Sequence, residues 1–391
     1  MEFEFPAEAE QFRAELRAFM DAELPDWWNG LFHDDDRIYP FTREFCMKLA
    51  ERDWLTMSWP VEHGGVDADV WSQMVVREEM WAAGEPRGPQ YMSLNYIGPM
   101  LMEFGTADQQ ERFLKPMAAG EVMWCQGFSE PEAGSDLAAL STRATDADGC
   151  FLVNGQKIWT SYATAADWCL LLCRTDLGER KHQGLSMLLV DMNTPGITVR
   201  PIDSMGGPQE FNEVFFDDVE VPYDCLLGPR GDGWRVAMST LAHERVGAAL
   251  HARVKVLLDA LIEYATTTRD ENGQPLAMRP SVRAGLVRLQ ARYRAARLLC
   301  YRVVSAMAAG DANVVDPAVS KVFSSELNIL IGNIGLDIVG ARGQLKTGDG
   351  LAPLDGLMND HWVHSIPQPI AMGTNEIQRN IISQRGLGLP R

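Results

Sequence analysis

The segment Phe128-Ser129-Glu130-Pro131-Glu132-Ala133-Gly134-Ser135-Asp136, together with Trp159-Thr160-Ser161 further along the chain, decides how the sequence is interpreted. The first stretch places small hydrogen-bonding residues on a tight loop, and the second adds an indole followed by two hydroxyl groups. A wide planar redox ring needs short donors along one polar edge and a flat apolar wall behind it. The two stretches therefore predict a bound redox cofactor, although neither contains an obvious catalytic base.

Hydrophobic patterning around these stretches divides the chain into three zones. Helical spacing dominates residues 1–120, short strands with intervening turns dominate residues 121–230, and long helices return in residues 231–391. This order predicts an α+β protein of three domains with those boundaries. It argues against a doubly wound sheet, and no G-x-G-x-x-G follows a strand, so nicotinamide binding in a Rossmann domain is not expected.

Some elements can be predicted individually. Thr106 is expected to cap a helix from Asp108 to Lys115. The strand Phe151-Leu152-Val153 is followed by Asn154-Gly155, a pair typical of two-residue hairpins. Apolar residues from Leu241 to Leu261 form one helical stripe. Further strands are expected at residues 167–174, 185–191, 197–201 and 213–221.

The composition excludes several classes of protein. With 35 basic and 54 acidic residues, the net charge of −19 argues against binding to nucleic acid or to an anionic membrane surface. No run approaches the ~20 apolar residues of a membrane span. The seven cysteines form no CxxC pair, and no second Cys or His pair has zinc-ligand spacing, so no metal is expected. Dispersed thiols without a signal sequence predict a soluble, cytoplasmic protein.

Four separated motifs resemble the acyl-CoA dehydrogenase family, and they occur in the order typical of that family. They are Ser129–Asp136, Asn154–Trp159, Phe211–Asp217 and Gly373–Arg379. The likeness covers essentially the whole chain. It implies an N-terminal helical domain, a middle β-barrel or sandwich domain, a C-terminal four-helix bundle, and FAD as cofactor with acyl-CoA as substrate.

The resemblance implies a role for each residue near the flavin. Gln126, Phe128 and Ser129 would meet the pyrimidine edge, where a hydrogen bond stabilises negative charge on the ring. Trp159 would lie against the isoalloxazine and Ser161 near its N5 atom. The same resemblance places Ser135 near the acyl-CoA. Taken alone, Trp159 could equally be a core aromatic and Ser129 a turn former.

A second group of residues is implied to approach FAD across a subunit interface. Arg269 matches an arginine that reaches the pyrophosphate of a neighbouring subunit, a task that suits its planar fork. Gly340, Thr374 and Glu376 match further positions around the cofactor. Two departures from the family pattern occur nearby, where Asn272 replaces a common aromatic residue and Ala341 replaces the second glycine of a Gly-Gly pair.

The catalytic base is the harder assignment. Many family members place a glutamate two residues before the threonine of the C-terminal Gly-Thr, but here that residue is Met372. Its backbone N–H could still polarise the thioester carbonyl. A second arrangement in the family supplies the carboxylate from the first helix of the C-terminal domain, which here implies Glu244 as base and Arg245 as a substrate-binding neighbour. The alternative is that Glu244 and Arg245 are an ordinary surface charge pair.

The resulting expectation is an FAD-dependent acyl-CoA dehydrogenase. It would remove an α-proton with Glu244, transfer a β-hydride to flavin N5, release a trans-2-enoyl-CoA and pass electrons to an electron-transfer flavoprotein. A homodimer or homotetramer is expected. Two alternatives remain, a subunit that shares FAD with a partner chain in a hetero-oligomer and a flavin oxidase or monooxygenase on the same scaffold. Tyr91 and Tyr96 suit either a ring-bearing acyl group or the core.

Overall fold

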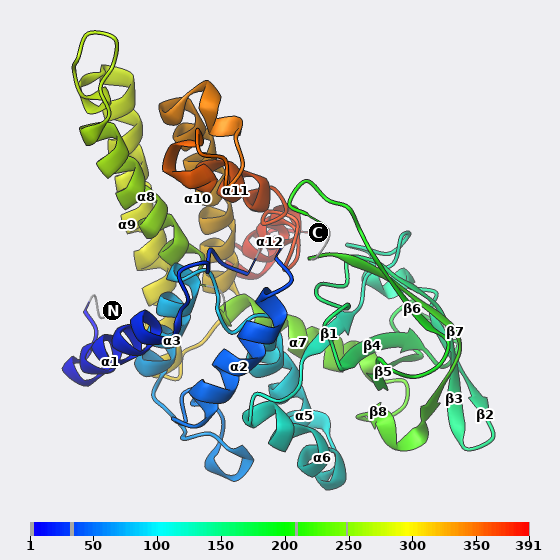
Figure 1. Ribbon diagram of the computed structural model, residues 1–391. Helices are drawn as coiled ribbons and strands as arrows, with labels where there is room; N and C mark the ends of the chain where they lie inside the picture. Colours follow the sequence, from blue (N-terminus) through cyan, green and yellow to red (C-terminus); the bar gives the residue numbers. More distant parts are fainter. Residues whose placement is uncertain (1–3, 32–34, 208–209, 248, 391) are drawn as a thin grey trace. The chain divides into compact units, whose positions relative to one another are not determined.

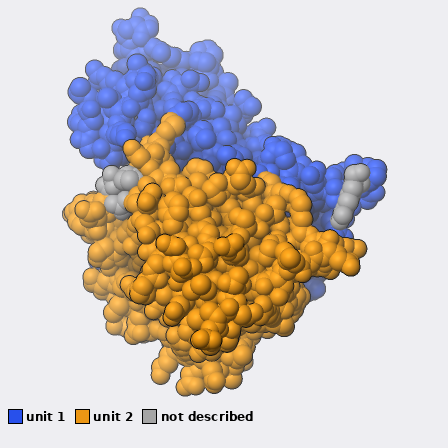
Figure 2. Space-filling view, turned by 90° about the vertical axis from the view of Figure 1, so that its right-hand side faces the viewer, with its two compact units in different colours: residues 1–22, 70–84, 248–391 blue, residues 23–69, 85–247 orange. Residues whose placement is uncertain are grey.

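The computed structural model describes residues 4–31, 35–207, 210–247 and 249–390, with the backbone alone for 242–247. The chain divides into two compact units, coloured separately in Figure 2. Unit 1 comprises residues 1–22, 70–84 and 248–391, and unit 2 comprises residues 23–69 and 85–247. This division differs from the three predicted domains, whose boundaries at 120 and 230 stay a prediction.

Unit 2 combines helices with a β-sheet (Figure 1). Its helical elements are α2 (Ile38–Ala50), η1 (Val61–His63), α4 (Gln90–Met92), η2 (Ser93–Ile97), α5 (Gly98–Phe104), α6 (Ala107–Ala118), η3 (Leu137–Ala139), η4 (Tyr223–Cys225) and α7 (Gly233–Gly247). Its strands are β1 (Trp124–Gly127), β2 (Arg143–Ala147), β3 (Cys150–Lys157), β4 (Trp168–Arg174), β5 (Leu185–Asp191), β6 (Ile197–Pro201), β7 (Asn212–Pro222) and β8 (Leu226–Leu227).

The strands of the described chain form one sheet in the order β6-β7-β3-β2-β4-β5-β8, with β1 parallel to β4. Most neighbours are antiparallel, which agrees with the predicted absence of a doubly wound sheet. The central residues of β4 and β5 are buried on both faces, so these strands lie in the core of unit 2. The predicted strands are confirmed as β4, β5, β6 and β7. The predicted Thr106 cap is confirmed as well, because Thr106 accepts a hydrogen bond from the Gln109 backbone N–H at the start of α6.

The hairpin predicted at Asn154-Gly155 is wrong. The strand β3 runs straight through this pair, and its register with β7 shifts between Val153 and Gly155. Gly155 has a φ of 152°, and a Cβ at this position would lie 2.5 Å from Thr142 Oγ1. The glycine therefore permits a bulge and a close approach, while the real turn joins β2 to β3 through Gly149.

Unit 1 consists of helices. They are α1 (Ala7–Glu23), α3 (Val70–Ala82), α8 (Leu250–Thr267), η5 (Leu276–Met278), α9 (Pro280–Ala308), α10 (Val315–Val339), η6 (Ala341–Gln344), η7 (Pro353–Gly356), α11 (Leu357–Ser365), α12 (Asn375–Ile381) and η8 (Ile382–Gly386). The single stripe predicted from Leu241 to Leu261 in fact covers two helices, α7 and α8. Ala249, with a ψ of 55°, lies outside the helical region immediately before α8.

The helix α10 is central to unit 1, since α8, α9, α11 and α12 all pack against it. Leu257, Leu289, Leu327 and Ile331 are fully buried in the shared core. Within the described residues, α10 is the one helix long and apolar enough to cross a membrane, and half of that apolar window is buried. Such a composition is expected of a helix covered on several sides by a bundle.

Candidate active site

A buried ion pair fixes the start of the loop that follows β1. Lys157 Nζ donates hydrogen bonds to the Phe128 carbonyl at 3.0 Å and to Glu130 Oε1 at 2.9 Å. Lys157 is fully buried and Glu130 nearly so. Glu130 also accepts hydrogen bonds from the backbone N–H groups of Ser141 and Thr142 and from the Ser141 hydroxyl, at 2.6 to 2.8 Å. The loop is therefore held from inside the protein.

The electrostatics of Glu130 reflect this environment. Burial alone would raise the pKa of its carboxyl, but the positive charge of Lys157 and the hydrogen bonds from Thr142 and Ser141 outweigh burial and lower the pKa to about 2. The carboxylate stays ionised throughout the physiological range. It therefore acts as a permanent acceptor that organises the loop.

The structure brings the Trp159 segment beside this loop. The Ile158 N–H donates to the Ser129 carbonyl at 3.0 Å, so the segments that carry Trp159 and Ser129 lie side by side. Trp159 has a φ of 59° and remains 56% exposed. Left-handed backbone is unusual for a bulky residue, and an exposed indole is unusual in itself. The surrounding structure thus holds a large apolar ring in an uncommon conformation at the surface of unit 2.

The polar groups around the indole are short and lack internal partners. Within the described part of the chain, the side chains of Gln126, Ser129 and Ser161 form no hydrogen bond, and the buried Thr160 Oγ1 and Asn212 Oδ1 atoms also have no partner. Buried polar atoms normally find partners, so unpaired ones indicate a ligand. These short polar groups and the flat indole fit a ring cofactor with a polar edge.

Ser135 lies on the exposed tip of the same loop. A Cβ added at the preceding Gly134 would meet nothing within 4 Å, and the following Asp136 pairs with Lys181 Nζ at 2.6 Å. Both partners of this ion pair are well exposed. The tip is thus open to solvent, in contrast to the loop's buried start at Phe128 and Glu130.

In unit 1, a second loop carries Met372 and Thr374. Lys321, buried on α10, donates through Nζ to the carbonyls of Pro369 and Gly373 and to Asn375 Oδ1, at 2.9 to 3.1 Å. Met372 has a φ of 57°, a second bulky residue in left-handed backbone. Its carbonyl accepts from Gln378 Nε2 at 2.8 Å. The loop conformation is therefore imposed by its surroundings, as is common at ligand-binding sites.

The predicted residues of unit 1 fall into two groups at opposite ends of α10. Thr374 caps α12, and the exposed Glu376 lies in the first turn of that helix, close to Lys321 near the start of α10. Gly340 follows the last residue of α10. It lies about 28 Å from the Lys321 position at ~1.5 Å per helical residue. Thus the structure does not bring Gly340 to Thr374 within one chain.

Arg269 lies toward the same end of α10 as Gly340. The Asn328 side chain of α10 bonds the Leu250 carbonyl, and Leu261 approaches Gly335, so α8 and α10 run in the same direction. Arg269, just past α8, therefore lies toward the Gly340 end of α10. Its side chain is exposed and, within the described residues, has no carboxylate partner. The guanidinium is free to meet an anion.

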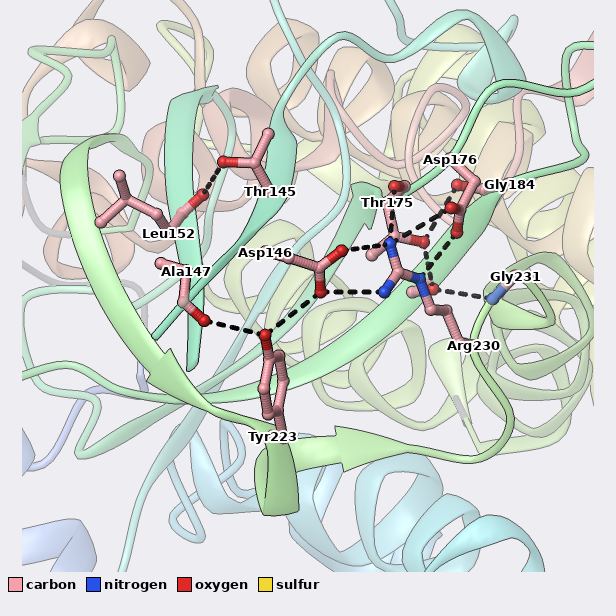
Figure 3. Close-up of polar contacts among 11 residues, drawn as sticks. Thr145, Asp146, Ala147, Leu152, Thr175, Asp176, Gly184, Tyr223, Arg230 and Gly231 are labelled. Atoms are coloured by element: carbon pink, nitrogen blue, oxygen red, sulfur yellow. Dashed lines mark hydrogen bonds and ion pairs between the residues drawn. The ribbon is translucent and has the colours of Figure 1, made fainter. Parts of the chain in front are cut away.

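Glu244 and Arg245 lie in α7, but their side chains are outside the described residues. The start of α7 is anchored firmly. In Figure 3, Arg230 bonds Asp146 in β2 and Asp176 just after β4, with contacts of 2.9 to 3.2 Å. A Cβ at Gly233 would lie 2.5 Å from the Ser186 backbone of β5. The helix that carries Glu244 thus begins at a fixed point on the sheet.

Comparison with known proteins identifies the fold. Three family models match, the acyl-CoA dehydrogenase N-terminal domain at residues 6–121, the middle domain at 125–219 and the C-terminal domain at 231–387. The chain is 36% identical to the acyl-CoA dehydrogenase IpdE1 of Mycolicibacterium smegmatis, over 98% of each chain. No group of three metal-ligating side chains occurs among the described residues.

Solved structures agree. The crystal structure of the ChsE4-ChsE5 complex from Mycobacterium tuberculosis matches with a TM-score of 0.91 at 30% identity, covering 100% of both chains. A structure titled Tcur3481-Tcur3483 steroid ACAD matches with a TM-score of 0.89 at 30% identity, also covering 100% of both chains. The chain therefore belongs to the acyl-CoA dehydrogenase family, whose members bind FAD, and is an oxidoreductase that acts on acyl-CoA.

Proposed function

We propose that this protein introduces an α,β double bond into an acyl-CoA thioester and releases the trans-2-enoyl-CoA, with Glu244 as the base. The observation that carries the proposal is the position of Trp159 beside Ser129. Short polar groups without hydrogen-bond partners adjoin its exposed indole there. Bound FAD would supply the hydride acceptor. Gln126, Phe128, Ser129, Trp159 and Ser161 would hold its ring, and Ser135 would meet the acyl-CoA.

Two residues divide the remaining work on the thioester. Met372 stands where many members of the family have the basic glutamate, and a thioether cannot usefully accept a proton. Its backbone N–H, held in position by the Lys321 contacts to this loop, would polarise the thioester carbonyl and make the α-proton more acidic. Glu244, on the anchored helix α7, would then remove that proton, with Arg245 binding the substrate.

The base assignment is tested with Glu244→Gln. The variant should lose roughly 10²- to 10⁴-fold in the rate of flavin reduction by acyl-CoA under single-turnover conditions, because general-base catalysis contributes a factor in that range. Retained flavin absorbance would show that the cofactor site is intact. Glu220→Gln, on the exposed side of β7, serves as a matched control. A Glu244→Gln enzyme that reduces its flavin at close to the wild-type rate would contradict the assignment.

For the substrate, we propose a ring-bearing acyl group of the steroid-derived type. One related structure is titled a steroid ACAD, and Tyr91 and Tyr96 supply large flat rings near the helix η2. Flavin bleaching with a panel of thioesters, from short straight chains to fused-ring acyl groups, tests this. Faster bleaching by straight chains would contradict the proposal.

A hetero-oligomeric assembly is the second candidate, in which two different chains share FAD. The separation of Arg269 and Gly340 from Thr374 and Glu376 suits a cofactor contacted by more than one chain, identical or different. The departures from the family pattern at Asn272 and Ala341 favour different chains. A related structure is a complex of two named proteins. Purification of the chain alone distinguishes the cases, since a yellow homodimer or homotetramer contradicts the hetero-oligomer.

Electron-transfer flavoprotein is the proposed acceptor, and rapid reaction of the reduced enzyme with oxygen would instead favour an oxidase or monooxygenase. We also propose a cytoplasmic location. All seven cysteines are free thiols, which suits a reducing compartment. Fractionation of cells that produce the protein would test this location directly.

A further inference from the structure

Four phenol rings and one carboxyl group gather beside the Trp159 segment. The Tyr162 N–H donates to the Glu210 carbonyl at 2.9 Å, which pairs the chain after β3 with the chain before β7. The Tyr162 ring is buried and packs edge-on against Tyr39, with ring centroids 6.4 Å apart. Burial raises the pKa of Tyr162 most, and the charges of Tyr91, Glu210, Tyr39 and Tyr96 raise it further. All four side chains therefore lie close to Tyr162. We call these five residues the Tyr162 cluster.

Glu210 is unusual because, among the described residues, no group compensates its charge. Burial raises the pKa of its carboxyl to about 7, and no cation of the described part of the chain opposes this effect. Within the described residues its side chain has no hydrogen bond and no ion pair. Apart from Glu210, the ionisable groups that raise the pKa of Tyr162 are the phenols of Tyr91, Tyr39 and Tyr96, from α4, α2 and η2. Glu210 is half-buried. Withdrawing an unpaired carboxyl from water even in part costs free energy, so its presence indicates a ligand rather than a structural role.

The backbone of the cluster is also held in an uncommon conformation. Tyr162 has a φ of 61°, three residues after Trp159 with its φ of 59°. Between them, Thr160 pairs with Asn212 through backbone and side-chain hydrogen bonds at 3.0 and 3.1 Å. Two bulky residues in left-handed backbone on one short segment mark a part of the chain shaped for binding. Tyr162 and the indole of Trp159 thus lie on the same short segment.

The chemistry of the cluster matches one kind of ligand. Phenol rings offer flat apolar faces that pack against a ring skeleton. A carboxylate accepts a hydrogen bond, whereas a phenol hydroxyl can donate one. A hydroxyl substituent both donates and accepts, so it would satisfy Glu210 and Tyr162 together. A ketone could accept from Tyr162 but could not donate to Glu210.

We propose that Glu210 and Tyr162 bind a hydroxyl group on the ring-bearing acyl portion of the substrate, so that the Tyr162 cluster determines substrate specificity. This inference rests on the proposed function as an acyl-CoA dehydrogenase. The substrate hydroxyl donates to the Glu210 carboxylate and accepts from the Tyr162 hydroxyl. Tyr39, Tyr91 and Tyr96 pack around the ring skeleton.

The test compares two fused-ring acyl-CoA thioesters that are identical except for one ring hydroxyl. With the wild-type holoenzyme, kcat/KM should favour the hydroxylated thioester about tenfold, the factor expected of a hydrogen bond to a charged group. Glu210→Gln should raise KM for that thioester about tenfold and leave its kcat and the KM of the other thioester unchanged. Tyr162→Phe should act in the same direction, and Glu220→Gln should have no effect.

The pH dependence separates binding from a structural role. For the wild type, KM of the hydroxylated thioester should fall as pH rises through about 7, because Glu210 ionises there. The Glu210→Gln enzyme should show no such change. Equal KM changes for both thioesters, or a preference for a ketone in place of the hydroxyl, would overturn the proposal.

Failure of the proposed function gives a different result. If neither thioester reduces the flavin of the wild-type holoenzyme, the protein is not a dehydrogenase of fused-ring acyl-CoA thioesters. Calorimetric titration with the two thioesters then still tests the cluster. A tenfold weaker binding of the hydroxylated thioester to Glu210→Gln supports the role of Glu210, and equal affinities for wild type and variant contradict it.

Discussion

Glu130 and Glu210 are carboxyl groups in the same unit, at the two edges of the Trp159 segment, and their environments shift them in opposite directions. Glu130 meets Lys157 and several N–H and O–H donors, and its pKa falls to about 2. Within the described residues Glu210 meets no cation, and burial raises its pKa to about 7. One carboxylate is part of the scaffold, and the other is left unsatisfied.

This difference teaches how the fold separates stability from binding. A buried charge that is fully paired organises backbone, as Glu130 does for the loop at Phe128. A half-buried carboxyl without a partner lowers stability and is retained where a ligand supplies the partner. This difference can be tested by removing a hydrogen-bond or ion-pair partner of Glu130, or by removing the charge of Glu210.

The largest effect is expected from Lys157→Met. This substitution leaves Glu130 buried without its cation, which should lower the free energy of unfolding by about 3–5 kcal/mol. The loop at Phe128 should loosen as well, so the purified protein should retain less flavin. Chemical denaturation and the ratio of flavin to protein absorbance measure both effects.

Lys181→Met is the matched control for that substitution. Lys181 forms an ion pair with Asp136 on the same loop, but both side chains are mostly exposed. Its removal should change stability by less than about 1 kcal/mol. Similar losses in the two variants would show that the burial of the Lys157–Glu130 pair has no special importance.

An intermediate effect of opposite sign is expected from Glu210→Gln. The pKa of Glu210 is higher in the folded protein than the ordinary 4.5, so the folded state holds an extra proton between pH 4.5 and 7. The stability of the wild type therefore falls as pH rises through this window. Glu210→Gln should be more stable than the wild type by about 2 kcal/mol at pH 8, allowing for partial solvent exposure.

Thermal unfolding at pH 5 and pH 8 measures this difference. The advantage of the Gln variant should shrink toward pH 5, where the wild-type carboxyl is protonated in the folded state. Exposed Glu220→Gln should show no pH-dependent difference. A Glu210→Gln protein that is less stable at pH 8 would mean that the carboxylate is compensated after all.

The smallest effect is expected from Ser141→Ala. The substitution removes one hydroxyl donor to Glu130 and leaves Lys157 and the two backbone donors in place. It should cost about 1 kcal/mol and raise the pKa of Glu130 slightly. Acid unfolding curves should therefore shift to higher pH. No shift would show that the remaining donors already satisfy the carboxylate.

The sequence predicts those parts of the fold that depend on local chemistry. The Thr106 cap and the strand Leu185–Asp191 follow from short-range signals and are confirmed. The pair Asn154-Gly155 misled because its turn propensity was overridden by pairing with β7, more than fifty residues away. The break before α8 was missed because apolar spacing continues across it.

The candidate site shows the same division. The side-by-side placement of Ser129 and Trp159 agrees with the motif spacing, and their cofactor roles stay predictions. Lys157 was missed, although a signal existed, since it lies on the inward face of β3 with Phe151 and Val153. Its partner Glu130 comes from a separate loop, which no local pattern identifies. Lys321 and Glu210 were missed for the same reason.

The contacts of Arg230 determine where the chain can be cut or rejoined. Connections between a sheet and a helix are usual sites for new chain ends, because they are exposed and weakly held. Here the connection before α7 is bound to Asp146, Asp176 and Ser186. A circular permutant opened between Arg230 and Gly233 should fold poorly. One opened at the turn near Gly273, where a Cβ would meet nothing within 4 Å, should be tolerated.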